Sequence, residues 1–115
     1  MTKEQFDSIT EWQNKTFGKA TPISKVHHLK EEVSELLAEL ENWYNTGFPK
    51  SETSFQDILI DKEFADCFIL LFGAAASHGM SYEDICKSID LKMQININRK
   101  WGEPKENGVV NHIKP

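Results

Sequence analysis

Two pairs of acidic residues in this sequence have a spacing that suits metal chemistry. Glu32 and Glu35 are three positions apart, and so are Glu63 and Asp66. Residues at i and i+3 of an α-helix are neighbours on its surface, so each pair holds two like charges together unless a cation lies between them. Carboxylate oxygens in this number suit Mg²⁺, with Mn²⁺ as a possible substitute. The two pairs therefore predict one metal site formed by four carboxylates.

Two other interpretations of these acids stay open. Glutamates on a helix usually form a solvated face, and Lys or Arg side chains from other helices can also pair with them. Asp66 favours a metal, because it is the only charged residue between Phe64 and Ala76. We expect Asp66 to be at least partly buried, where an unpaired carboxylate needs a cation, a metal or a proton.

A basic and amide-bearing strip follows near the end of the chain. Lys92, Asn96 and Arg99 recur at i, i+4 and i+7, which places them on one face of a helix. Ordinary solvation explains such a strip when it stands alone. Beside a metal site, however, ammonium, amide and guanidinium groups are suited to phosphate oxygens. We therefore predict that this strip binds a polyphosphate.

Aromatic side chains near both ends of the chain are candidates for stacking on a base or a sugar. They are Trp12 and Phe17 near the start and Trp101 just after the basic strip. Packing in a core or an interface is the competing explanation for each of them.

Helices are the elements that must position these residues. Apolar residues recur every three or four positions from Val26 to Tyr44, which predicts a helix with one apolar face. Cap residues, glycines and prolines then set the ends of the expected helices. These helices span residues 3–16, from a cap at Thr21 or Ser24 to about 45, from about 55 to 77, and from a cap at Ser81 to about 100. The sequence predicts a single all-α domain over residues 1–115, a bundle of four to five helices.

The third expected helix is apolar nearly all round, so it must be covered on every side. One chain of 115 residues supplies few neighbours for this purpose. We therefore expect a homodimer or a higher oligomer.

Composition narrows the class of protein. Apolar residues make up 39% of the chain, which is too high a share for a disordered chain. Charged residues make up 27% and interrupt the apolar stretches too often for a membrane span. The net charge of −5 works against binding to DNA or RNA polymers. Charged residues are spread through the first 20 positions, so we expect no secretory leader and a cytoplasmic location.

These motifs together resemble those of the all-α NTP pyrophosphohydrolases of the MazG superfamily. The likeness covers about residues 11–113 and rests on three segments in the family's order. His28–Leu36 resembles the first metal motif, Glu-x-x-Glu, and Lys62–Asp66 resembles the second, Glu-x-x-Asp. Lys92–Trp101 resembles the closing Lys-x-x-x-Asn-x-x-Arg-x-aromatic segment.

Further residues are similar to the branch of dATP/dGTP diphosphohydrolases. They are Trp12 with Thr16-Phe17-Gly18, and the tail from Trp101 to Ile113. The branch often has an acid where this chain has Asn111.

The resemblance implies Mg²⁺-dependent hydrolysis of a nucleoside triphosphate to the monophosphate and pyrophosphate. Purine deoxynucleotides, dATP and dGTP, are the expected substrates, and the active sites would lie near subunit contacts of a homodimer or homotetramer. Glu35, next to Glu32, would orient the attacking water or accept its proton. The alternatives are a dUTPase-like or other house-cleaning nucleotide hydrolase, and a non-catalytic helical interaction module.

Overall fold

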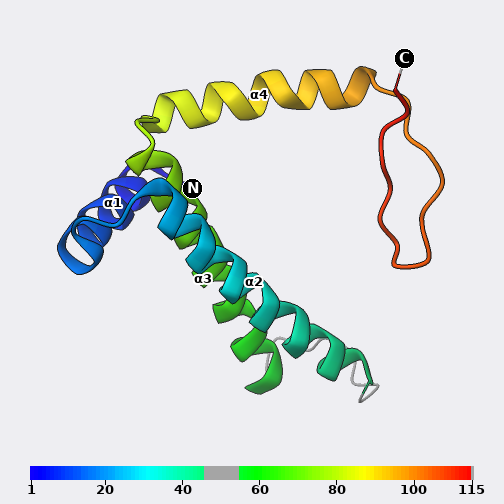
Figure 1. The fold of residues 1–115 in the computed structure, drawn as a ribbon, viewed down its shortest axis with the longest axis horizontal. Helices are drawn as coiled ribbons and strands as arrows, with labels where there is room; N and C mark the ends of the chain where they lie inside the picture. The colour runs from blue at the N-terminus through cyan, green and yellow to red at the C-terminus, as the bar shows by residue number, and fades with distance from the viewer. Residues whose placement is uncertain (46–54, 115) are drawn as a thin grey trace. The chain divides into compact units, whose positions relative to one another are not determined.

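The part of the chain that the structure describes contains four helices (Figure 1). The computed structural model describes the backbone of residues 1–45 and 55–114, and the side chains of residues 1–45 and 59–114. The helices are α1 (Lys3–Phe17), α2 (Pro22–Asn45), α3 (Phe55–Ser77) and α4 (Tyr82–Asn98). The all-α prediction and the order of the helices are confirmed. Within the described residues, the only β-type pairing is an isolated antiparallel bridge between Trp101 and His112.

The chain divides into two compact units, Met1–Tyr82 and Glu83–Pro115. In the first unit, α2 and α3 lie side by side and run in opposite directions (Figure 1). Their contact buries a small apolar core made of Leu36, Trp43 and Ile60. This antiparallel packing decides which residues of α2 face which residues of α3.

Side-chain caps set the starts of α1 and α2. The backbone N–H of Gln5 donates to Thr2 Oγ1 at 3.1 Å, and the Thr2 N–H donates back to Gln5 Oε1 at 2.9 Å. This reciprocal pair is a capping box. The Ser24 N–H likewise donates to Thr21 Oγ1 at 3.1 Å, and Pro22 takes the first helical position, where its missing N–H costs nothing. Thr21, rather than Ser24, is therefore the cap of α2.

The helix α4 ends at Asn98, two residues before the predicted end at about Lys100. The reason lies in the backbone carbonyl of Asn96, which would accept from the Lys100 N–H if the helix continued. Instead the Trp101 indole N–H donates to this carbonyl at 3.0 Å, and the Arg99 N–H donates to it at 3.3 Å. The second unit continues as a loop that the bridge from Trp101 to His112 closes.

A buried polar contact joins α1 to α3. Gln13 is only 1% exposed, and its amide Nε2 donates to the backbone carbonyl of Ile69 at 2.8 Å. A Cβ at Gly73 would coincide with the Gln13 amide, so the glycine makes this approach possible. The contact fixes the rotation and height of α1 against α3.

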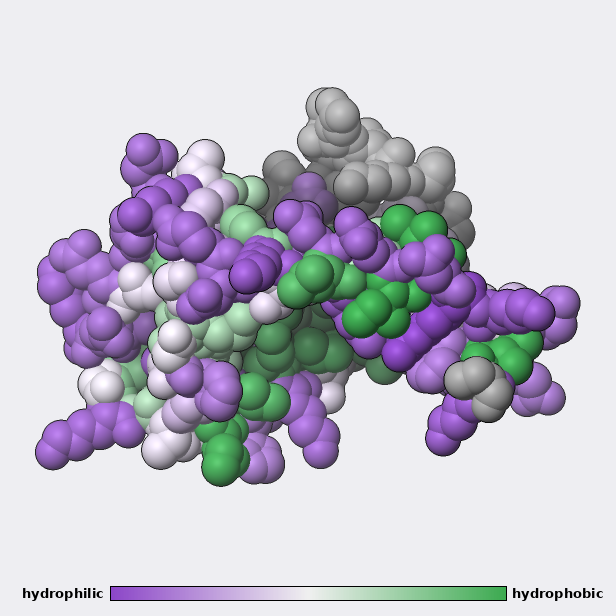
Figure 2. Space-filling model, turned by 90° about the horizontal axis from the view of Figure 1, so that it is seen from above, coloured by the Kyte–Doolittle hydropathy of each residue, from purple (hydrophilic) through white to green (hydrophobic). Residues whose placement is uncertain are grey.

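Large apolar side chains remain exposed on the first unit. Phe68 and Leu37 are 56% and 55% exposed, and Phe64, Leu71 and Val33 are also open to solvent. Figure 2 shows hydrophobic side chains, in green, at the surface of the molecule among polar ones in purple. Their exposure agrees with the expected self-association, which stays a prediction. No helix in residues 1–45 and 55–114 is both long and apolar enough to cross a membrane.

Candidate active site

Three of the four predicted carboxylates meet between α2 and α3. One carboxylate oxygen each from Glu32, Glu63 and Asp66 lies within 4.8 Å of the others. Glu32 comes from the middle of α2, and the other two come from successive turns of α3. The antiparallel packing of the two helices brings these acids together, although more than 30 residues separate Glu32 from Asp66. We call these three residues the carboxylate cluster.

Glu35, the fourth predicted ligand, lies beside the carboxylate cluster and is exposed. The pKa of the Glu32 carboxyl is raised, and Glu35 is one of the causes, through its charge and through a hydrogen bond that a protonated Glu32 can donate to it. Partial burial is the largest cause of the raised pKa, followed by repulsion from Glu35 and then from Asp66 and Glu63. All four acids therefore interact electrostatically, and a cation among them would relieve their repulsion.

The donor set fits a divalent cation with a preference for oxygen ligands. Glu63 Oε2 is buried and has no hydrogen-bond partner among the described residues. A buried carboxylate oxygen without a partner is uncommon, and an ion is one of the partners that satisfies it. Nor does any described Lys or Arg of the first unit form an ion pair with the cluster, as the competing interpretation of these acids would require within that unit. Mg²⁺ and Mn²⁺ both suit such a set of carboxylates.

Asp66 differs from expectation, because it is exposed rather than partly buried. Its apolar neighbours Phe64 and Phe68 are exposed as well, at 40% and 56%. That face of α3 has no cover within the described residues of the first unit. An isolated charge in an apolar segment therefore did not imply burial within one chain.

A row of aromatic rings leads away from the carboxylate cluster. The Nε2 atom of His28 lies 3.7 Å from Glu32 Oε1, and the His28 ring meets Phe17 edge to face with centroids 5.7 Å apart. The rings of Phe17 and Trp12 are also edge to face, at 5.3 Å. Trp12 remains half exposed. The structure thus connects two of the three predicted stacking residues, Trp12 and Phe17, to the cluster through His28. From the sequence, His28 was only the first residue of the His28–Leu36 motif, and no role in the site was predicted for it.

The model of one protein family, described as dATP/dGTP pyrophosphohydrolase, matches residues 56–115. This chain belongs to the dATP/dGTP pyrophosphohydrolase family. The match covers Glu63 and Asp66 together with Lys92, Asn96 and Arg99, whereas Glu32 and Glu35 precede it. The protein is accordingly a nucleotide pyrophosphohydrolase by family, and the resemblance inferred from its motifs is confirmed.

A solved structure supports the fold independently. The MazG-like pyrophosphohydrolase of cyanophage S-2L, bound to dGDP and three catalytic Mn²⁺ ions per active site, superposes with a TM-score of 0.70. The two proteins are 24% identical, and the alignment covers 100% of this chain and 96% of that chain. The comparison with curated proteins finds no match.

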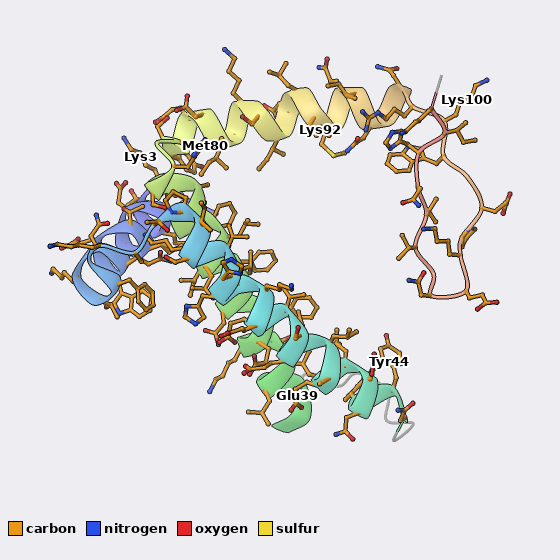
Figure 3. The ribbon with its side chains drawn as sticks, viewed as in Figure 1. Lys3, Glu39, Tyr44, Met80, Lys92 and Lys100 are labelled. Atoms are coloured by element: carbon orange, nitrogen blue, oxygen red, sulfur yellow. The ribbon has the colours of Figure 1, made fainter. Side chains whose placement is uncertain are left out.

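The residues predicted to bind phosphate lie in the second unit of this pyrophosphohydrolase. Lys92 projects from α4 and is exposed, as Figure 3 shows, while Asn96 and Arg99 are half-buried. Trp101 follows the helix and is 45% exposed. The structure describes this unit separately from the carboxylate cluster, so the role of these residues in a shared site stays a prediction.

Proposed function

We propose that this protein hydrolyses the purine deoxynucleotides dATP and dGTP to the monophosphate and pyrophosphate, with Mg²⁺ as the cofactor and Mn²⁺ as a substitute. Membership in the family supports the reaction class. The convergence of Glu32, Glu63 and Asp66 within 4.8 Å is the observation that carries the proposal for the metal.

The carboxylate cluster and Glu35 would hold the metal. Glu63 contributes the buried oxygen that lacks a partner, and Glu32 faces it from α2. A divalent cation bound there would neutralise charge on the phosphates and activate water as a Lewis acid. The four acids would thereby set where the substrate phosphates bind, since a metal held there would attract them.

Glu35 has a different environment from the buried oxygen of Glu63. It is exposed and hydrogen-bonds to Glu32, so its carboxylate can reach both solvent and the cluster. We assign to Glu35 the orientation of the attacking water and the acceptance of its proton, with Glu32 holding Glu35 in position.

Substrate contacts beyond the metal fall to the remaining predicted residues. Trp12 and Phe17 form an aromatic surface that His28 connects to Glu32, and this surface suits stacking on the nucleoside. The strip of α4 would bind phosphate oxygens through Lys92, Asn96 and Arg99, and Trp101 would support it. A homodimer or homotetramer would cover the exposed apolar residues of α2 and α3.

Pyrophosphate release from each canonical and deoxy nucleotide tests this proposal. Glu63→Gln and Asp66→Asn each remove a charged ligand, and we expect a loss of more than about 100-fold, since changes next to metal ligands alone cost roughly 10- to 100-fold. Glu41→Gln, which changes an exposed glutamate at the far end of α2, should retain full activity.

Binding measurements complete the test. Titration calorimetry with Mn²⁺ should give heat with the wild-type protein and with Glu41→Gln, and much less with Glu63→Gln. Full activity in both ligand variants would refute the metal site. A wild-type protein that releases no pyrophosphate and binds no Mn²⁺ would instead favour the non-catalytic interaction module.

A further inference from the structure

A separate cavity of about 240 Å³ lies in the first unit, among α1, the start of α2 and the end of α3. Phe6 and Met80 contribute apolar surface, and Gly73 lies against the Gln13 amide. Neutral polar groups in the lining come from Thr10, Asn14 and Ser77. Two polar residues of the lining, Lys25 and Gln13, are nearly inaccessible to solvent. None of the acids of the carboxylate cluster lines this cavity.

Lys25 is 6% exposed, and no described residue forms a hydrogen bond or an ion pair with its ammonium group. Gln13 is in a similar position, because Nε2 donates to Ile69 while Oε1 is buried without a partner among the described residues. Polar groups removed from water are costly unless something pairs with them. The lining therefore offers one fully buried acceptor without a partner, Gln13 Oε1, and an ammonium group of Lys25 that is unpaired within the described residues but keeps contact with water.

Helical geometry aligns this cavity with the carboxylate cluster. Lys25 and Glu32 are seven residues apart on α2. Seven residues rotate the helix to within about 20° of two full turns and advance it about 10 Å along its axis, so the two side chains lie on the same face. Gly73 and Asp66 have the same separation on α3. Lys25 precedes Glu32 on α2, whereas Gly73 follows Asp66 on α3. Because the two helices are antiparallel, Lys25 and Gly73 are displaced from these acids in the same direction in space. The cavity residues Lys25 and Gly73 thus lie on the same helix faces as the cluster, about two helical turns away along the axes.

We propose that this cavity receives the purine base and that Lys25 makes the enzyme prefer 6-oxopurines, guanine above all, over adenine. The inference rests on the proposed function. Guanine presents two acceptors, O6 and N7, on one edge, and an ammonium group can donate to both. Adenine has an amino donor in place of O6, and this donor faces the ammonium unfavourably. Gln13 Oε1 would accept from the N1–H or the 2-amino group of guanine.

The terminal phosphate of the substrate fits this cavity less well than a base. A phosphate there would place about two negative charges against a single ammonium group, because the other polar residues of the lining, Thr10, Asn14 and Ser77, are neutral, and the excess charge would be left unpaired. A neutral base needs a donor, an acceptor and some apolar surface, which Lys25, Gln13 and Phe6 supply.

The test compares kcat/KM for dGTP, dITP and dATP. With the wild-type enzyme, dITP should behave like dGTP, because it keeps O6 and lacks only the 2-amino group. Lys25→Met should lower the ratio of dGTP to dATP by roughly 10- to 100-fold, the discrimination that one such bidentate contact gives. The activity on dATP should persist. Lys15→Met, which removes an exposed lysine from α1, should leave the ratio unchanged.

Three outcomes would overturn the assignment of Lys25. The first is an unchanged ratio of kcat/KM for dGTP to that for dATP in an active Lys25→Met variant. The second is an equal loss of activity on all three substrates in that variant, which a contact to phosphate predicts. The third is a wild-type enzyme that cleaves dITP as poorly as dATP. The last comparison needs no variant, so misfolding of Lys25→Met cannot obscure it. A wild-type protein inactive on every nucleotide would refute the proposed function itself, which separates the two failures.

Discussion

Replacing Gly73 by alanine should destabilise this protein, although the same change stabilises an ordinary exposed helix. An alanine in a helix interior is favoured over glycine by about 1 kcal/mol. At Gly73, however, the added methyl group coincides with the side-chain amide of Gln13. The amide must leave a site in which it is 1% exposed and hydrogen-bonded to Ile69, so the sign of the effect is reversed.

The magnitude follows from what Gln13 loses. The hydrogen bond contributes about 1 kcal/mol net, and forcing extra volume into a packed contact costs about 1–3 kcal/mol. Subtracting about 1 kcal/mol for helix propensity leaves a destabilisation of about 1–3 kcal/mol. For a chain of this size, each kcal/mol lowers Tm by roughly 4 °C, so the expected decrease is about 4–12 °C.

Thermal and urea unfolding at one fixed protein concentration measure this effect, since self-association would make Tm depend on concentration. Gln13→Ala supplies the control, because it removes the group with which the added methyl at position 73 would collide. The double variant should be more stable than the sum of the two single changes by at least about 1 kcal/mol, as coupled neighbours require. A rise in Tm for Gly73→Ala alone, or strict additivity, would show that the contact between α1 and α3 is wrongly placed.

Two further predictions concern charge and capping. Because the pKa of Glu32 is raised above its ordinary value of 4.5, the folded protein binds this proton more tightly than the unfolded chain, and stability is lost as the pH rises through the raised pKa. Glu32→Gln should therefore raise the Tm of the metal-free protein at about pH 7 but much less at about pH 4. Thermal unfolding in the presence of a chelator measures this difference. A gain in Tm that does not depend on pH would contradict the electrostatic cause. Thr2→Ala removes the capping box of α1 and should cost about 1 kcal/mol in urea unfolding. An unchanged midpoint would mean that the start of α1 adds nothing to stability.

The helices could be predicted because their signals are local. Caps, prolines and glycines stand in the sequence within a residue or two of the ends that the structure shows. The third helix was predicted from about Phe55 to Ser77 and has these bounds. The end of α4 was missed, since it depends on the Trp101 side chain folding back onto a carbonyl five residues earlier.

The acidic pairs could also be read from spacing, because i and i+3 neighbours share a helix face whatever the rest of the fold does. For the two pairs to meet, α2 and α3 needed only to pack with the acid-bearing side of each helix next to their common interface. The exposure of Asp66 could not be predicted, since it depends on which face of α3 another element covers. The burial of Lys25 was equally hidden, because a lysine at the start of an amphipathic helix has no sequence feature that distinguishes it from a solvated one.

The seven-residue spacing on α2 and α3 also constrains how such an enzyme can evolve. A single-residue insertion between Lys25 and Glu32 would turn one of them about 100° away from the other and separate the cavity from the carboxylates. Point substitutions within the cavity carry no such penalty, since two turns of helix isolate them from the acids. Changes of base preference should therefore arise by replacement of cavity residues at constant helix length, while the chemistry at the acids is inherited unchanged.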